Sequence, residues 1–502
     1  MSISTATPEK IEETLELLWL RVRQRGDLPG FAKVVNAITR AMRGEEDRQF
    51  CMTRIVLSDP ALTQRVLRLA NSAMYSAFGR KINTVSKAVM VLGIESIGHL
   101  AIGLKLIEDL SAASAGAPGA RDEMEKAVFA GHIGRQLAAS AGHDNIEEAV
   151  VCSILHSLGR MMTVFYLPDL WLEVQTHIAQ AISDEATATQ AVLGLPLDQL
   201  GRLTAQHWGL PESLTGSIQD IPPESSQGLL DRSAWLAALS TMSSGCAQIL
   251  CNDSPSASIA LTQIADGYAG MLGIEAPQIL AAVKTAHQHA HKEAVFADTG
   301  TLRKRTKTAE ASRHPGKPVN AVMRLATGVA DLRGIATAAS STQMVAMALE
   351  IIYRSLGFSR AISFLCNADR TQYCAGLCFG EDVQEKRAEL KFSTAYQPDA
   401  FHVALAHDKI IFVENAKAPN FANKLPQWWK QTLSGARSFI ILPLRAHHQP
   451  VGFIYADWDE TLAPHRIDPA EIQTLGALRG LVGLALENTG TKQASLSASV
   501  PT

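Results

Sequence analysis

EEAVVCSILHSLGRM, residues 147–161, is the stretch that decides the fold class of the first half of the chain. Ile154, Leu155 and Leu158 fall on one face of a helix, so the pattern predicts a helix that buries this face. The same helix carries His156, and VFAGHIGRQLA at 128–138 places His132 on an upstream helix. Alanine and leucine recur at three- and four-residue spacing through the first 300 residues, which predicts an all-α region.

Local signals mark several helix ends in this region. Asp59 is expected to cap a helix that begins at Pro60, because proline has no amide hydrogen to lose at the first helical position. A helix from about Val85 should stop near Gly93, which suits a left-handed cap. The small residues of SAASAGAPGA at 111–120 predict a break between two helical lobes.

The composition is typical of a folded protein with several domains. The 502 residues are 47% hydrophobic and 19% charged, which is enough apolar surface to offset chain entropy. A formal net charge of -3 gives no global reason to bind nucleic acid or a membrane. The amino-terminal sequence lacks the regions of an export signal, and no run of about 18 apolar residues occurs. Seven cysteines form no CxxC pair, so we expect free thiols in the cytoplasm.

The hydrophobic period changes after a basic segment, TLRKRTKTAEASRHPGKP at 301–318, which predicts a solvated linker. A long helical segment from Asn320 to Leu356 follows, and a final helix covers about Asp468 to Glu487. Between them, runs that predict strands lie at 361–366, 371–379, 409–415, 439–445 and 451–458, with AHHQP as a hairpin connection. The pattern predicts an α+β domain with an antiparallel sheet flanked by helices.

The predicted organisation has five parts. They are an N-terminal helix at 1–24, an all-α region at 25–298, a basic linker at 299–318, a sheet domain at 319–490 and a disordered tail at 491–502.

Ordered motifs give the first half a resemblance to the HDOD family, a relative of the HD-type metal phosphohydrolases. The motifs are DLPGFAKVVNAI, LSDPALTQRVLRLANSAMYS, INTVSKAVMVLGIESI, ILHSLGRM and HWGLPESL. The resemblance covers about residues 25–290 and implies a multidomain protein that opens with an HDOD-like helical region.

The enzyme hypothesis can be tested on individual residues. By the resemblance, a phosphohydrolase holds its metal with spaced histidines and an adjacent His-Asp pair, whose carboxylate is anionic. Here the pair reads His156-Ser157, and relatives often carry a His-His pair near the position of Gln219 and Asp220. Too few ligands remain for two metals, so we predict a degenerate, non-catalytic site at His132, His156 and Ser157. The alternative is one weakly held ion on the two histidines.

The second half resembles the GAF family of small-molecule sensors over about residues 335–488. The resemblance rests on SFIILPLRAHHQPVGFIYAD at 438–457, with IIFVENAKAPNF ahead of it. It implies a pocket on one face of the sheet that holds an unknown small ligand or none. The Cys-His pair that attaches bilins and the signature of cyclic-nucleotide binders are missing, so no cofactor is assigned. Possible pocket residues are Phe364, Cys366, Cys374, Cys378, Trp428, Trp429 and Tyr455.

Two features of this predicted pocket have alternative interpretations. Cys374 and Cys378 are four residues apart, so on a strand they should face the same side, with Cys366 on the neighbouring strand. They are redox or metal residues, or else small buried hydrophobes. Trp428 and Trp429 fall in a predicted loop and either line a ligand or cover the core.

We therefore predict a bacterial signal-transduction protein in which the GAF-like domain regulates the protein interactions of the HDOD-like module. The alternative is a divergent metal phosphohydrolase acting on a nucleotide. The partners are expected to be signalling proteins and a second copy of the chain, and we expect no binding to membranes or nucleic acid. The seam of the homodimer should lie on helices carrying Val322, Leu325, Val329 and Leu332, unless these residues only pack on their own sheet.

Overall fold

A computed structural model gives the fold. It describes residues 8–26, 29–44, 48–71, 82–113, 119–143, 146–181, 184–223, 230–252, 257–290, 316–380 and 383–497. Most of the predicted linker and part of the break at 111–120 lie outside these ranges. The chain forms two compact units. The helical unit comprises Met1–Arg48, Gln64–Leu69 and Leu92–Thr308, and the sheet unit comprises Gln49–Thr63, Ala70–Val91 and Ala309–Thr502.

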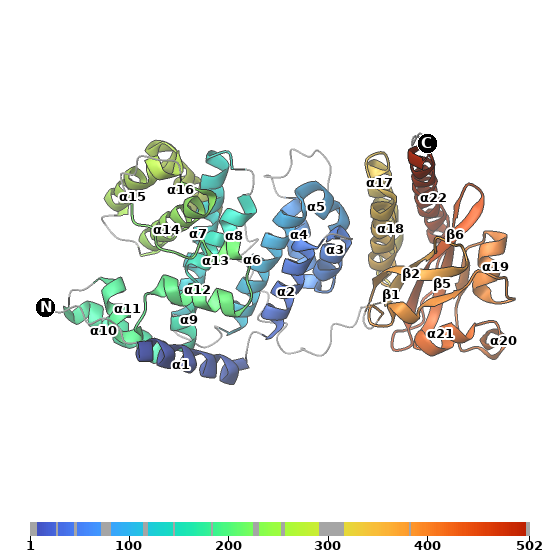
Figure 1. Ribbon diagram of the computed structural model, residues 1–502, viewed down its shortest axis with the longest axis horizontal. Helices are drawn as coiled ribbons and strands as arrows, with labels where there is room; N and C mark the ends of the chain where they lie inside the picture. Colours follow the sequence, from blue (N-terminus) through green and yellow to red (C-terminus); the bar gives the residue numbers. More distant parts are fainter. Residues whose placement is uncertain are drawn as a thin grey trace. The chain divides into compact units, whose positions relative to one another are not determined.

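The helical unit is all-α over its described residues, as predicted (Figure 1). Its helices are α1 (Pro8–Gly26), α2 (Pro29–Arg43), α6 (Ile94–Ala113), α7 (Ala120–Ser140), α8 (Ile146–His156), α9 (Leu158–Tyr166), α10 (Pro168–Ala181), α11 (Glu185–Leu193), α12 (Leu197–His207), α13 (Glu212–Thr215), α14 (Arg232–Cys251), α15 (Ala257–Leu272) and α16 (Ala276–Ala290).

Helix α8 is the centre of this unit and packs against α6, α7 and α14. Leu155 is fully buried, which confirms the burial that the sequence predicted. Helix α7 approaches closely because it has glycines at the contact: a Cβ on Gly131 would lie 2.8 Å from Ile154 Cγ1, and one on Gly134 would lie 2.2 Å from Ser153 Oγ. Small residues at this crossing therefore fix how α7 and α8 pack.

Two helical stretches in the described part have the length and hydropathy of a membrane crossing, Ile146–Tyr166 and Arg232–Cys251. The bent pair Val85–Leu92 and Ile94–Asp109 would be a third. In the first stretch 83% of the most apolar window is buried inside the protein, and in the second 56%. Burial inside the protein accounts for the apolar character of the first stretch.

Two further helices, α3 (Arg48–Leu57) and α5 (Val85–Leu92), contribute most of their residues to the sheet unit, and α4 (Pro60–Ala70) is divided between the two units. Asp59 Oδ1 accepts hydrogen bonds from the amides of Ala61 and Leu62, at 2.9 and 3.1 Å, which confirms the predicted cap of α4. Gly93 has φ of 87° and ends α5, also as predicted. Helix α6 then begins at Ile94.

The sheet of the second unit has six strands in the order β3-β2-β1-β6-β5-β4, and every pairing is antiparallel. The strands are β1 (Arg360–Cys366), β2 (Gln372–Phe379), β3 (Lys391–Ser393), β4 (Ile411–Val413), β5 (Ala436–Ala446) and β6 (Gln449–Asp459). His447 and His448 join β5 to β6 with φ of 49° and 63°, the left-handed geometry of a two-residue hairpin turn. The predicted hairpin is confirmed.

Helices cover both faces of the sheet (Figure 1). Helices α17 (Ala321–Ile335), α18 (Ser341–Leu356) and α22 (Pro469–Ser497) pack on one face, where Ile440, Leu442, Ile454 and Ala456 point. The other face carries the alternate residues of the same strands under α19 (Ala400–His407), α20 (Pro419–Ala422) and α21 (Gln427–Thr432); a 3-10 turn, η3, covers Arg387–Glu389. The predicted α+β class is confirmed, and both faces are apolar because both are covered.

Three predicted boundaries in the second half need correction. The segment from Asn320 to Leu356 is two helices, because Ser340 and Gln343 form a capping box that starts a new one. Helix α22 runs to Ser497, into the predicted tail, since no proline interrupts it before position 501. The end of the predicted linker is anchored: Lys317 Nζ lies 2.7 Å from Glu471 Oε2 at the start of α22.

The predicted dimer seam on α17 is largely inside the chain's own core. Leu325 and Leu332 are fully buried and Val329 is 5% exposed, all three packed with α18, α22 and the sheet. A Cβ on Gly328 would lie 2.6 Å from Ile351 Cγ2, so α17 and α18 are in close contact. Only Val322, at 40% exposure, is accessible. The heptad-like spacing reflects intramolecular packing, and the prediction for Leu325, Val329 and Leu332 was wrong.

Candidate functional site

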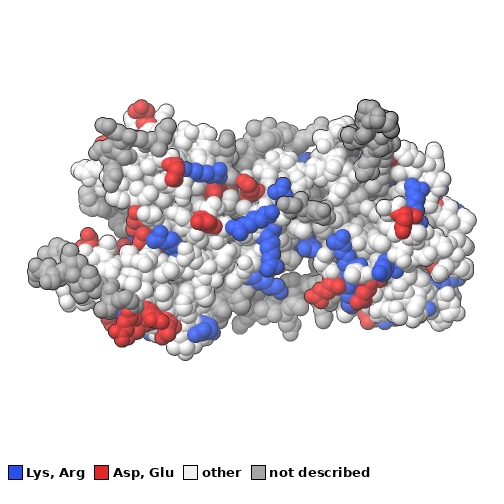
Figure 2. All heavy atoms as spheres, in the orientation of Figure 1, with Lys and Arg blue, Asp and Glu red and all other residues white. Residues whose placement is uncertain are grey.

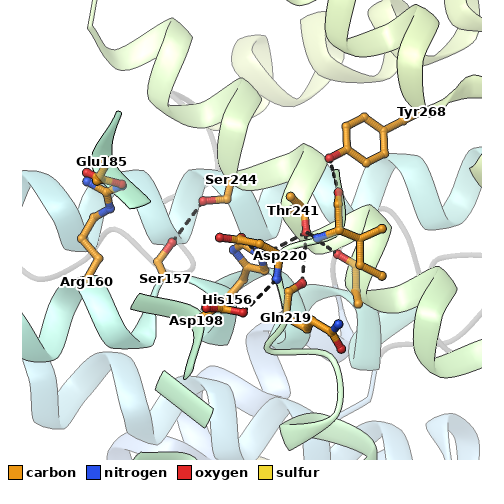
Figure 3. Close-up of polar contacts among 12 residues, drawn as sticks. His156, Ser157, Arg160, Glu185, Asp198, Gln219, Asp220, Thr241, Ser244 and Tyr268 are labelled. Carbon is orange, nitrogen blue, oxygen red and sulfur yellow. Dashed lines mark hydrogen bonds and ion pairs between the residues drawn. The ribbon is translucent and has the colours of Figure 1, made fainter. Parts of the chain in front are cut away.

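His156 ends α8 and lies at the centre of a polar cluster in the helical unit (Figure 3). Its ring nitrogen Nε2 lies 3.1 Å from Asp220 Oδ1 and 3.1 Å from Thr241 Oγ1 on α14. The His156 side chain is 7% exposed, whereas that of Asp220 is 64% exposed. The hydrogen bond from His156 holds the pKa of the Asp220 carboxyl below its ordinary value. The cluster thus pairs a buried imidazole with a carboxylate that solvent reaches.

Hydrogen bonds fix the segment that carries Asp220. The amide of Asp220 donates to Asp198 Oδ2 at 3.3 Å, and the amide of Ile221 donates to Thr241 Oγ1 at 3.1 Å. The Tyr268 hydroxyl donates to the Ile221 carbonyl at 2.5 Å. Residues of α12, α14 and α15 thus hold the backbone at 220–221 and keep Asp220 beside His156.

Ser157 stands where an HD enzyme would carry aspartate. Its hydroxyl lies 3.4 Å from that of Ser244 on α14 (Figure 3). One turn further, Arg160 pairs with Glu185 and lies 3.6 Å from Glu123 Oε2. The side chain after His156 is therefore neutral, and the guanidinium of Arg160 is already paired with the carboxylates of Glu185 and Glu123.

The cluster does not fit a two-metal centre. Beside His156 it offers one carboxylate, from Asp220, and neutral hydroxyls. His132 is buried on α7, and within the described ranges no three His, Cys, Asp or Glu residues are grouped as a metal would require. The groups of the cluster are hydrogen-bonded to one another.

Sequence reasoning located part of this site. It singled out His156, Ser157 and Asp220, and the structure brings the first and last together. It missed Thr241 and Ser244, since both lie on α14, far along the chain from α8. Neither belongs to a motif, so no signal in the sequence could have placed them there.

A second histidine, His99 on α6, is buried without forming a site. It is 3% exposed, and neither ring nitrogen has a hydrogen-bond partner among the described residues. Burial lowers its pKa below the ordinary value, Arg232 acts in the same direction, and Glu148 and Glu95 oppose it. The folded protein therefore holds this imidazole neutral.

We expect His99→Leu to stabilise the protein, and more so at low pH. Below about pH 6.5 the unfolded chain protonates His99, while the buried ring protonates only at lower pH, so the wild type loses stability as pH falls. Removing two unpaired buried polar atoms should add about 1–2 kcal/mol at pH 8. Urea unfolding at pH 8 and pH 5.5 measures this, with His177→Leu at an exposed position of α10 as control. A His99→Leu gain that shrinks at low pH would contradict the prediction.

In the sheet unit, the predicted pocket residues lie on the face under α19–α21, with one exception. Phe364 and Tyr455 are fully buried, Cys378 and Trp429 are nearly so, and Cys366 and Trp428 are partly buried beside them. Aromatic rings fill this face: Phe364 stacks on Phe453 at 4.6 Å, and Trp428 stacks on Phe392 at 4.9 Å between centroids. The tryptophans lie on a short helix, α21, where the sequence had predicted a loop.

A series of buried hydrogen bonds lies beneath the aromatic rings of this face. Trp429 Nε1 donates to the Tyr455 hydroxyl at 3.1 Å, and that hydroxyl donates to Asp457 Oδ2 at 2.7 Å. Arg360 Nε lies 3.0 Å from both oxygens of Asp457. Burial raises the pKa of Asp457, an effect that Arg360 opposes, and the carboxylate remains paired. These hydrogen bonds tie α21 to β1 and β6.

The exception is Cys374, and the prediction that it shares a face with Cys378 was wrong. Cys378 is opposite Ile362 and Cys374 is opposite Leu365, residues that point to different faces. Strand β2 has an extra residue where the register shifts, with Ser363 Oγ accepting from the Leu377 amide at 2.8 Å. This bulge reverses the alternation between the two cysteines. All seven cysteines are free thiols.

The described part of the helical unit has a surface hollow of about 460 Å³. Its lining consists of Asn36, Thr39, Arg40, Arg43, Gly44, Gly209 and Leu210. On the face drawn in Figure 2, basic side chains form a short run over α2, α4 and α6. The lining residues that the structure describes include two arginines and no carboxylate or histidine.

Comparison with known proteins agrees with this architecture. Residues 28–221 match the HDOD domain, and residues 342–486 match the GAF domain. No curated protein matches the chain.

Several solved structures are similar. A putative phosphohydrolase from Shewanella amazonensis is 22% identical and has a TM-score of 0.41, covering 57% of this chain and 97% of its own. An HDOD domain protein of unknown function from Geobacter sulfurreducens is 20% identical, with a TM-score of 0.42 and coverage of 57% and 98%. The GAF domain of an Acinetobacter phosphoenolpyruvate-protein phosphotransferase is 14% identical, with a TM-score of 0.27 and coverage of 35% and 96%.

The order of the two matches along the chain is the order of the two kinds of fold, first all-α and then an antiparallel sheet between helices. The chain therefore contains an HDOD domain followed by a GAF domain, an arrangement that indicates a signalling protein.

Proposed function

We propose that this protein transmits a signal without catalysing a reaction: its GAF domain senses a small ligand or a partner and alters the protein interactions of the HDOD domain. The observation that carries the non-catalytic part is the pairing at His156. Its Nε2 is hydrogen-bonded to Asp220 and lies beside Thr241, and Ser157 replaces the anionic ligand that should follow it. A site satisfied internally has little to offer a divalent metal.

The sensing part rests on the aromatic face of the sheet. Trp428, at its edge, is partly buried and stacked on Phe392, so movement of α21 would open this face to an apolar or aromatic ligand. We place the protein in the cytoplasm, where its free cysteines would stay reduced. We retain a homodimer as part of the proposal, with its contact away from the buried residues of α17.

Metal content and turnover test the proposal directly. We expect the purified protein to hold less than one equivalent of iron or manganese by elemental mass spectrometry and to leave cyclic dinucleotides intact. Native mass spectrometry of the same sample would show a retained small molecule and the dimer. About two equivalents of metal together with phosphodiesterase turnover would refute the proposal.

One observation favours the alternative, a divergent phosphohydrolase. Asp220 brings a solvent-exposed carboxylate to within 3.1 Å of His156, so these two side chains form a pair that one ion could reach. One histidine and one carboxylate are fewer ligands than a catalytic metal needs. The metal analysis separates the two functions.

Replacing Ser157 with aspartate is expected to leave the protein without phosphodiesterase activity. The new carboxylate would restore the His-Asp pair, but the second histidine pair would still be missing at Gln219 and Asp220. The measurement is hydrolysis of cyclic dinucleotides with added manganese. The control is Ser157→Asn, because asparagine has nearly the same shape as aspartate but no charge. Turnover by Ser157→Asp alone would show that the remaining ligands suffice.

A further inference from the structure

Within the sheet unit, a glutamate of the GAF domain caps a helix of the HDOD domain. Glu350 on α18 is fully buried, and its carboxylate accepts hydrogen bonds from the amides of Val85 and Ser86 at 2.7 and 2.8 Å. These are the first two residues of α5. The third amide, of Lys87, is 3.3 Å from Thr84 Oγ1. The amides of a first helical turn have no partner within their own helix, so α5 depends on Glu350 for two of them.

Further contacts surround this carboxylate. Lys87 Nζ donates to Asp331 Oδ1 on α17 at 2.8 Å, and Asn83 Nδ2 donates to Asp331 Oδ2 at 2.8 Å. Arg354, one turn after Glu350, donates to both Glu350 Oε1 and the Asn83 carbonyl at 3.2 Å. We call this group, Glu350, Asp331 and Arg354 with residues 83–87, the α5 clasp. Its charges are paired within the group, which makes their burial tolerable.

Helix α3 contacts the end of β2 and the start of α18. The Phe50 ring lies 5.0 Å from Phe379 at the end of β2, and Phe379 stacks on Tyr353 of α18 at 5.6 Å. Gln343 at the start of α18 donates to Gln49 at 2.6 Å. On β2 the residue before Phe379 is Cys378, which points to the aromatic face. One strand therefore contacts both the candidate sensing face and an HDOD helix.

From these contacts we infer that the GAF domain controls the HDOD domain by holding helix α5, and with it α3, through the α5 clasp. Helix α5 has eight residues, too few to be stable alone, so its order depends on the groups that pair its first turn. A shift of α18 would withdraw Glu350 from two amides at once. The bearing on signalling rests on the proposed function, but the clasp is testable without ligand or partner, so the two can fail separately.

Amide hydrogen exchange on the full chain tests the clasp. In Glu350→Gln the side-chain amide can accept from only one of the two backbone amides, and we expect exchange in residues 82–92 to rise about 10- to 100-fold. Residues 436–459, which form β5 and β6, should be unchanged. Glu389→Gln removes the same charge from an exposed position in the GAF domain and is the control. Equal exchange at 82–92 in Glu350→Gln and the wild type would overturn the inference.

Two further measurements keep the test decisive. If Glu350→Gln also loosens β5 and β6, Asp331→Asn weakens the ion pair with Lys87 without touching Glu350, and 82–92 should again exchange faster. In the wild type, the denaturant dependence of exchange at 82–92 should follow that of 436–459. If it instead follows α8 at 146–156, α5 unfolds with the helical unit and the GAF domain does not hold it.

Discussion

Leu155→Asp is expected to unfold the helical unit, lowering its free energy of unfolding by about 4 kcal/mol or more. Leu155 is fully buried near the C-terminal end of α8, which packs on α6, α7 and α14. The substitution removes a large apolar side chain and leaves a carboxylate with no partner in an apolar environment. Circular dichroism during heating would record the loss of the helical signal.

The matched control is Leu172→Asp on α10. Leu172 is 67% exposed in the same unit, so its substitution should leave the melting temperature nearly unchanged. If both variants melt at the wild-type temperature, α8 is not buried in solution.

Gly159→Ala should cost about 3 kcal/mol, although it adds a single methyl group. A Cβ at this position would lie 1.8 Å from the carbonyl oxygen of Leu197 and 2.8 Å from the amide nitrogen of Gly201. Both atoms belong to the backbone of α12, so no side chain can rotate away and the two helices must separate. The melting temperature and a urea midpoint would measure the loss.

Gly270→Ala on α15 separates this steric effect from the helical preference of alanine. Nothing lies within 4 Å of a Cβ there, and the change should stabilise the helix by about 0.5–1 kcal/mol. If Gly159→Ala is as stable as Gly270→Ala, the contact between α9 and α12 is looser than the structure has it.

The parts of the fold that follow local rules could be predicted from the sequence. Asp59 before Pro60, Gly93 after α5 and the apolar runs on either side of His447-His448 each carry their own signal, because caps and hairpins depend on residues close in the chain. The break within the 320–356 segment was missed, although Ser340 and Gln343 are the capping-box pair that starts the second helix.

The candidate sites were less predictable, for a physical reason. The partners of His156 and Glu350 come from distant segments, and nothing in a local pattern encodes which helices will meet. The sequence placed Cys374 on the same face as Cys378, but β2 contains one extra residue between them. An extra residue reverses the alternation of side chains along a strand, so a prediction from two-residue periodicity fails beyond a bulge. The three- and four-residue spacing of Leu325, Val329 and Leu332 predicts one apolar helix face, but it does not distinguish packing within the chain from packing in a dimer.

The way the sheet unit is assembled determines how the protein can be dissected. The GAF match covers residues 342–486, yet the unit also uses Gln49–Thr63 and Ala70–Val91. A fragment cut at the basic linker would retain every strand but lose Phe50, leaving a gap in the apolar core and the Glu350 carboxylate without its amide donors. The complementary fragment would keep α5 without the groups that pair its first turn. Truncations placed by sequence alone would therefore give two fragments that each lack native contacts. Binding measured on either fragment would reflect the loss of these contacts as well as the properties of the domain.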